Sequence, residues 1–125
     1  MPNQAYRLHV RHKVWLDGAD RFALGDGGVE LLRAIDATGS IRAAAQEVGW
    51  SYRHTLAYLA TAERGLGYLL VERARGGHQR GGALLTPEGR AFLRRYTVFR
   101  RRLDAALDRL SRSLLIAAGH HAPAR

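Results

Sequence analysis

GSIRAAAQEVGWSYRHTLAYLATAE, the stretch from Gly39 to Glu63, decides the fold of this chain. It contains two short helical patterns, Ile41–Val48 and Tyr52–Arg64. Ser40 and Ser51 stand immediately before them, and serine is a favoured N-cap because its side chain satisfies an amide of the first helical turn. The stretch therefore predicts two capped helices in close succession.

Small residues occupy both the turn between these helices and the face on which they meet. Gly49 is able to adopt the left-handed conformation that reverses the chain at low cost, and the run Ala43–Ala45 lets the two helix axes approach. Three- and four-residue spacing predicts an inward face, made of Ile41, Ala44, Ala45, Val48, Thr55, Leu59 and Ala62. Helix-turn-helix readers of DNA need this arrangement, because the first helix braces the second so that its N-terminal end enters the major groove.

Composition limits the remaining classes of protein. The chain has 125 residues, of which 46% are hydrophobic, enough for one domain with a modest core. Cysteine is absent, which excludes disulfides and thiolate metal sites. No apolar run is long enough to span a membrane, and the N-terminus lacks the apolar core of a signal peptide. We therefore expect a cytoplasmic, nucleoid-associated protein with no membrane partner.

The charge of the chain indicates a polyanionic partner. The net charge is +9 and the isoelectric point is about 11.2, which is typical of nucleic-acid-binding domains. Residues 26–50 carry more acids than bases, whereas residues 51–125 carry an excess of arginine. We expect the acidic segment to face away from double-stranded DNA and the basic segments to face it.

The residues before the two helices predict a β-hairpin and a third helix. Apolar side chains alternate with basic ones from Tyr6 to Leu16, a period of two that indicates a half-buried strand. A turn is expected at residues 17–20 and a short returning strand at Arg21–Leu24. Asp26 is the expected cap of a helix over Val29–Ala37.

The residues after the two helices predict a wing and a long final helix. Strands at Leu69–Ala74 and Ala83–Leu85 flank a glycine-rich basic loop at residues 75–82. Thr86-Pro87-Glu88 combines a cap, a proline at the first helical position and an acid in the first turn, so a helix is expected from there to about Ala117. The predicted fold is α+β and mainly helical: one domain over residues 1–118, followed by a flexible tail at 119–125.

The motifs ELLRAIDATGSIRAAAQEVGWSY and LLVERARGGHQRGGALLTPEGRAFL, in this order, resemble the N-terminal DNA-binding domain of the ModE-type molybdate-dependent transcription regulators. They are more distantly similar to the LysR-type helix-turn-helix. The resemblance implies a winged helix-turn-helix that dimerises partly through its last long helix. Full-length members of the ModE-type family carry oxyanion-binding modules after this domain, whereas this sequence stops at Arg125. We therefore expect a free-standing variant that does not respond to molybdate.

The residues expected to contact DNA lie just before the first helix, at the start of the second helix and in the wing. They are Ser40, Ser51, Tyr52, Arg53, His54, Arg75, His78 and Arg80. Arg53 is able to form a fork onto guanine, while Ser51 and Tyr52 suit phosphate. The alternatives are that Tyr52 packs, that Arg53 is only solvated and that the glycine-rich loop is a plain surface loop. Trp50 is expected to pack rather than to contact DNA.

The final helix carries an apolar stripe at three- and four-residue steps. Its members are Tyr96, Phe99, Leu103, Leu107, Leu110 and Leu114. Such a stripe on a terminal helix indicates a surface for a partner helix, and we expect a homodimer. The alternative is that the stripe faces the core of its own chain, at least as far as Phe99.

These patterns favour a sequence-specific transcription regulator, a dimer that reads a pseudo-palindromic operator. No catalytic, cofactor or metal constellation stands out, so we expect no enzyme and no cofactor. The alternatives are a nucleoid-type architectural protein that binds DNA without sequence preference, and an adaptor whose helix-turn-helix has lost DNA binding. A ratio of specific to non-specific affinity near one would favour the architectural protein.

Overall fold

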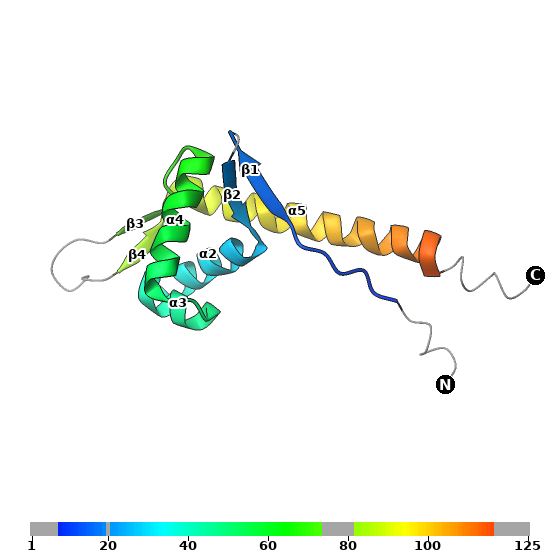
Figure 1. Cartoon of the computed structure of the whole chain (residues 1–125), viewed down its shortest axis with the longest axis horizontal. Helices are drawn as coiled ribbons and strands as arrows, with labels where there is room; N and C mark the ends of the chain where they lie inside the picture. The colour runs from blue at the N-terminus through cyan, green and yellow to red at the C-terminus, as the bar shows by residue number, and fades with distance from the viewer. Residues whose placement is uncertain (1–7, 20, 74–81, 117–125) are drawn as a thin grey trace, which may run out of the picture. The chain divides into compact units, whose positions relative to one another are not determined.

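The computed structural model describes residues 8–19, 21–73 and 82–116 (Figure 1). The chain forms two compact units, one of residues 13–96 and one that combines residues 1–12 with 97–125. In chain order the elements are β1 (Trp15–Gly18), β2 (Arg21–Gly25), α2 (Asp26–Thr38), α3 (Ile41–Val48), α4 (Tyr52–Leu66), β3 (Val71–Arg73), β4 (Ala83–Leu85), α5 (Pro87–Ser111) and a π-helical turn at Arg112–Ile116.

The boundaries of α3 and α4 are set by local chemistry. Ser40 and Ser51 are N-caps, and each Oγ accepts a hydrogen bond of 3.0 Å from the backbone amide three residues later. Gly49 has a φ of +81° and ends α3 in the left-handed conformation, which costs a glycine little because it has no Cβ. The predicted caps and turn are confirmed.

The core of the larger unit is built around α2. Leu31, Leu32 and Ile35 of this helix are fully buried, and α2 packs against α3, β2 and β4. Six of the seven predicted inward residues are buried: Ile41, Ala44, Ala45, Thr55, Leu59 and Ala62. Val48 is half-buried and packs against the same core. Alanines on the facing surfaces let α3 and α4 approach, and Figure 1 shows the two helices following one another around a sharp turn.

The N-terminal hairpin is shorter than the sequence predicts. β1 pairs antiparallel with β2, and the pairing ends where Trp15 lies opposite Gly25. Residues 8–14 form no regular strand, so the expected strand over Tyr6–Leu16 is wrong for this segment, while Tyr6 lies outside the described residues. The physical reason is the start of α2 at Asp26: β2 has no further residues with which the earlier segment could pair.

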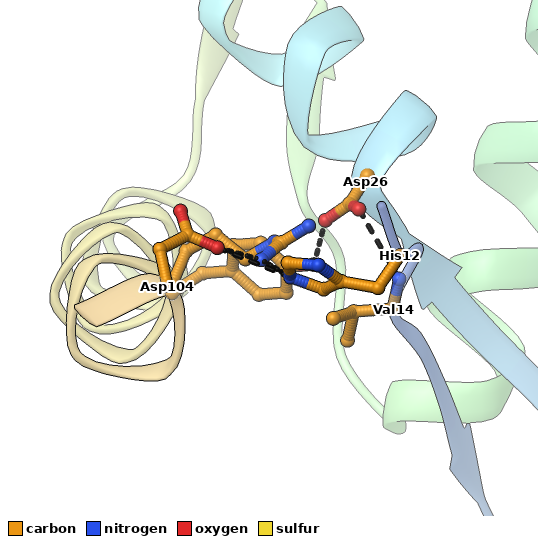
Figure 2. Close-up of polar contacts among 6 residues, drawn as sticks. His12, Val14, Asp26 and Asp104 are labelled. Atoms are coloured by element: carbon orange, nitrogen blue, oxygen red, sulfur yellow. Dashed lines mark hydrogen bonds and ion pairs between the residues drawn. The ribbon is translucent and has the colours of Figure 1, made fainter. Parts of the chain in front are cut away.

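Asp26 does not cap α2 as expected, because the N-cap residue is Gly25 and no side chain bonds the first turn there. The Asp26 carboxylate instead accepts a hydrogen bond of 3.1 Å from the amide of Val14, as Figure 2 shows, and another from the hydroxyl of Tyr96. The carboxylate thus ties the start of α2 to two segments of the same unit that are distant in sequence.

The second hairpin follows α4. β3 and β4 pair antiparallel, with Val71 opposite Leu85 and Arg73 opposite Ala83. The strand expected from Leu69 starts two residues later, and Leu69 is 60% exposed. The amides of Leu70 and Val71 donate to the Glu63 carboxylate at 2.8 and 3.3 Å instead of to a strand.

The start of α5 matches its predicted signal. The Oγ1 of Thr86 accepts a hydrogen bond of 2.9 Å from the amide of Gly89 and donates one of 2.6 Å to the carbonyl of Leu69. Pro87 is the first residue of the helix. The helix continues as far as Ser111 and the π-helical turn extends to Ile116. Ala117, expected as the end, and the expected tail at 119–125 lie outside the described residues.

Together these elements form the winged helix-turn-helix that the sequence predicts: α3 and α4 are joined by a glycine turn and followed by a two-stranded hairpin. Within the described part of the chain, no helix combines the length and the apolar character that crossing a bilayer requires.

Candidate nucleic-acid interface

The first turn of α4 presents polar side chains to solvent. Ser51, Arg53 and His54 are exposed, and Tyr52 is half-buried. The Ser51 Oγ accepts from the amide of His54 and keeps its own O–H as a donor. Its backbone carbonyl accepts from the Oγ1 of Thr55 at 2.8 Å, which satisfies this fully buried hydroxyl. The helix start is thus fixed from the inside while its outer face stays open.

Arg53 retains a positive charge that no described carboxylate neutralises. Two other arginines of the larger unit differ: Arg33 pairs with Glu30 at 3.2 Å, and Arg90 pairs with Asp36 at 2.9 Å. Both of these pairs involve acids of α2, the helix within the acidic segment. An exposed guanidinium in the first turn of a helix is suited to a bidentate contact with guanine or phosphate.

The ring of His54 packs against an aromatic cluster that includes Trp50 and Tyr58. The ring of Trp50 meets the His54 ring edge-on at a centroid distance of 4.7 Å and lies 5.0 Å from the ring of Tyr58. Tyr58 in turn contacts Phe22 of β2 at 5.7 Å, and its hydroxyl accepts a 3.1 Å hydrogen bond from the amide of Gly25. Trp50 is half-buried and packs against the core, as the sequence predicts.

Burial of the Tyr58 ring raises the pKa of its hydroxyl above the ordinary value, although hydrogen bonds from the amides of Gly25 and Gly28 act in the opposite direction. The phenol therefore stays neutral at physiological pH. Gly28 leaves the space that the Tyr58 ring occupies, since a Cβ there would collide with that ring. Tyr58 thus anchors α4 to the N-terminal hairpin and to α2.

Sequence reasoning missed one exposed residue, Arg42. Its guanidinium carbon lies 4.0 Å from the centroid of the Tyr52 ring, so the second residue of α3 stacks on the first residue of α4. The helical spacing of Ile41, Ala44 and Ala45 leaves Arg42 on the outer face, which is a signal that the sequence contains. The partner of Arg42 follows only from the angle at which the turn sets the two helices.

The base of the wing lies beside the start of α3. Ser40 and Gly82 form an isolated antiparallel bridge, and the amide of Ala83 donates to the carbonyl of Gly39 at 2.8 Å. The wing residues predicted to contact DNA, Arg75, His78 and Arg80, lie outside the described residues. Ser40 is half-buried, and its hydroxyl oxygen serves as the cap of α3.

The apolar stripe of α5 divides into a buried and an exposed part. Tyr96 is 4% exposed and packs in the core of the larger unit, so the core-facing alternative applies to it. Leu103 and Leu107 are half-buried. Phe99, Leu110 and Leu114 are 45%, 55% and 65% exposed.

Three arginines follow one another in α5, at positions 100, 101 and 102. Arg100 differs from the other two because it makes polar contacts within the smaller unit. His12 Nε2 lies 3.1 Å from Asp104 Oδ1 and 2.6 Å from Arg100 Nη1, and Arg100 also pairs with Asp104. Figure 2 shows His12 and Asp104 directed toward one another. Arg101 and Arg102 are exposed, so only these two present their charge to solvent.

Comparison with known proteins identifies relatives of this domain. A sequence model of the family described as "Bacterial regulatory helix-turn-helix protein, lysR family" matches residues 28–90. The chain is 39% identical over 92 residues to the "Molybdenum transport protein ModE" of Azotobacter vinelandii, an alignment that covers 74% of this chain and 34% of that protein. It is 37% identical over 91 residues to the "Molybdenum-pterin-binding protein MopB" of Rhodobacter capsulatus, covering 73% and 34%.

A third relative is the "DNA-binding transcriptional dual regulator ModE" of Escherichia coli strain K12, 34% identical over 83 residues, with 66% of this chain and 32% of that protein covered. The chain thus spans about a third of the length of these curated relatives.

The chain is also similar to solved structures of a LysR family regulator. The crystal structure titled "CbnR_DBD-DNA complex" superposes with a TM-score of 0.51 at 30% identity, covering 71% of this chain and 93% of that chain. The structure titled "CbnR, a LysR family transcriptional regulator" superposes with a TM-score of 0.54 at 26% identity, covering 67% and 27%.

Proposed function

Because the chain belongs to the lysR family of bacterial regulatory helix-turn-helix proteins, with a helix-turn-helix domain like that of ModE, we propose that it binds double-stranded DNA sequence-specifically and regulates transcription. The observation that carries the proposal is the first turn of α4. There the exposed Arg53 and His54 stand on a capped, tightly packed helix, and no described carboxylate pairs with Arg53. The similarity to a domain solved in complex with DNA supports the same reading.

In this proposal α4 enters the major groove and its first turn reads base edges. Arg53 donates a bidentate pair of hydrogen bonds to a guanine, while Ser51 and Tyr52 contact phosphate. The wing at residues 75–82, with Arg75, His78 and Arg80, adds contacts to phosphate or to the minor groove. The site of action is the bacterial nucleoid in the cytoplasm.

The operator is pseudo-palindromic and the protein binds it as a homodimer. Two copies joined through the exposed part of the α5 stripe would present their α4 helices to half-sites roughly 34–36 Å apart, one turn of DNA. The exposure of Leu110 and Leu114 supports this arrangement, because rows of exposed leucine are uncommon on monomers.

The proposal is tested by selection of bound sequences from a pool of random duplexes, followed by affinity measurements at fixed salt. We expect a preferred sequence with two related half-sites and an affinity at least about a thousandfold above that for a scrambled duplex. The net charge of +9 also suits an architectural protein that binds without preference. A ratio near one would favour that alternative and contradict sequence-specific regulation.

A further inference from the structure

Arg42 and Tyr52 form a contact between the outer faces of α3 and α4, in the first turn of each helix. The Arg42 guanidinium lies over the Tyr52 ring, with its carbon 4.0 Å from the ring centroid. Tyr52 is half-buried and packs against the core, so its ring is a fixed platform. Arg42 itself is exposed, so its guanidinium lies over the ring at the surface of the protein.

The stack occupies one face of the guanidinium and leaves the N–H donors at its edge available. An arginine stacked on an aromatic ring keeps its full charge and its fork of donors, which fits the geometry of a phosphate. Within the described residues no carboxylate pairs with Arg42, in contrast to Arg33 and Arg90 on other helices. Part of the rotamer entropy that Arg42 would lose on binding an anion is already lost in the folded protein.

We propose that Arg42 and Tyr52 together form a binding position for a DNA phosphodiester, in which Arg42 donates hydrogen bonds to the phosphate and the Tyr52 ring holds the Arg42 guanidinium in place. The inference rests on the proposed function, since it requires a helix-turn-helix that docks on DNA. In that docking mode the first helix of the motif crosses the DNA backbone while the start of the second enters the groove. The contact fixes the position of Arg53 over the bases without reading sequence itself.

A purely structural role for the same contact makes different predictions. A stack that only fastens α3 to α4 would contribute to the stability of the fold and leave the electrostatics of DNA binding unchanged. A phosphate contact contributes to the number of counterions released from DNA, which is measured by the slope of log affinity against log salt.

The first test is Arg42→Gln in the full chain, with a random-sequence duplex about three helical turns long as the probe. We expect affinity at 0.1 M salt to fall roughly five- to tenfold for each protomer bound, and the salt slope to fall by about one unit. The matched control is Arg33→Gln, which removes the same charge from α2. An Arg33→Gln variant that lost as much affinity and slope would contradict a specific contact at Arg42.

The second test asks whether Tyr52 acts through Arg42. Tyr52→Phe keeps the ring and Tyr52→Leu removes it, so their difference in affinity isolates the stack. We expect Tyr52→Leu to bind roughly two- to fivefold more weakly than Tyr52→Phe, the equivalent of an exposed cation–π contact, and the two to bind equally when Arg42→Gln is also present. The same difference with and without Arg42→Gln would overturn the coupling. Thermal unfolding of every variant verifies that each is folded.

The outcomes separate this inference from the proposed function. Wild-type protein that fails to bind any duplex contradicts both. Wild-type protein that binds, with Arg42→Gln unchanged in affinity and salt slope, contradicts the phosphate position alone. A loss of stability in Arg42→Gln without a change in salt slope assigns the stack a structural role and contradicts the inference as well.

Discussion

At the scale of single residues, two helical glycines have opposite surroundings. A Cβ at Gly65 in α4 would lie 2.5 Å from the carbonyl oxygen of Phe22 and 2.8 Å from the Cα of Ala23. We expect Gly65→Ala to push α4 away from β2 and to lower the free energy of unfolding by about 1–3 kcal/mol. Denaturant unfolding monitored by circular dichroism measures the change.

Gly27 in the first turn of α2 is the matched control. A Cβ there would meet only the Trp50 ring, at an ordinary contact distance of 3.5 Å. Gly27→Ala is expected to be neutral or to stabilise by up to about 1 kcal/mol, because alanine loses less backbone entropy in a helix. Equal effects of the two substitutions would mean that the close approach of α4 to β2 is not what requires Gly65.

Residues that act on near neighbours could be predicted from the sequence, and residues that act across the fold could not. Ser40 and Ser51 bond amides three residues away, so their spacing alone identifies them as caps. Asp26 has the same local signal, yet its partners Val14 and Tyr96 are 12 and 70 residues away. A carboxylate accepts several hydrogen bonds. The Asp26 carboxylate accepts them from Val14 and Tyr96 and not from an amide of the first turn of α2.

At the scale of elements, the connection between α4 and β3 depends on Glu63. Its carboxylate accepts hydrogen bonds from the backbone amides of Leu70 and Val71. These two amides lie after the end of α4 and at the start of β3. We expect Glu63→Ala to lower the free energy of unfolding by roughly 1–3 kcal/mol, because two part-buried amides lose their acceptor. Chemical denaturation provides the measurement.

The control for this prediction is Glu47→Ala. Glu47 is an exposed acid near the end of α3, and its removal should change stability by no more than about 0.5 kcal/mol. If both variants lose the same stability, the effect of Glu63 is one of general charge rather than of its two hydrogen bonds.

The lengths of strands were the least predictable feature of the elements. Alternation of apolar and basic side chains extends well before Trp15, but a strand exists only where a neighbour pairs with it, and β2 ends at Gly25. Leu69 has the residue type of a strand, yet the Glu63 contact and Thr86 hold the chain there in another conformation. Helix boundaries were predicted better because their caps are local.

At the scale of the whole molecule, we expect a dimer that depends on the exposed leucines of α5. Leu110 is 55% exposed, so Leu110→Glu leaves the packing of the single chain unchanged and places a charge in the proposed seam. Its dimer dissociation constant should rise by on the order of a hundredfold or more, because a buried unpaired charge is costly. Sedimentation equilibrium of wild type and variant gives the two constants.

Ala105→Glu is the control for charge, since Ala105 is also exposed on α5 but stands outside the stripe. It should dimerise as the wild type does. A monomeric wild type at tens of micromolar, or a Leu110→Glu variant that remains as tightly dimeric as the wild type, would show that this stripe is not the interface.

The central claim is that the first turn of α4 reads the bases of an operator, and Arg53→Ala tests it most directly. Affinities are measured at one salt concentration for the selected operator and for its scrambled duplex, with Arg64→Ala, at the far end of the same helix, as the control. The account predicts that Arg53→Ala loses about 1–3 kcal/mol on the operator, with a much smaller loss on the scrambled duplex. Arg64→Ala should keep the preference. Equal losses by Arg53→Ala on both duplexes would contradict the account.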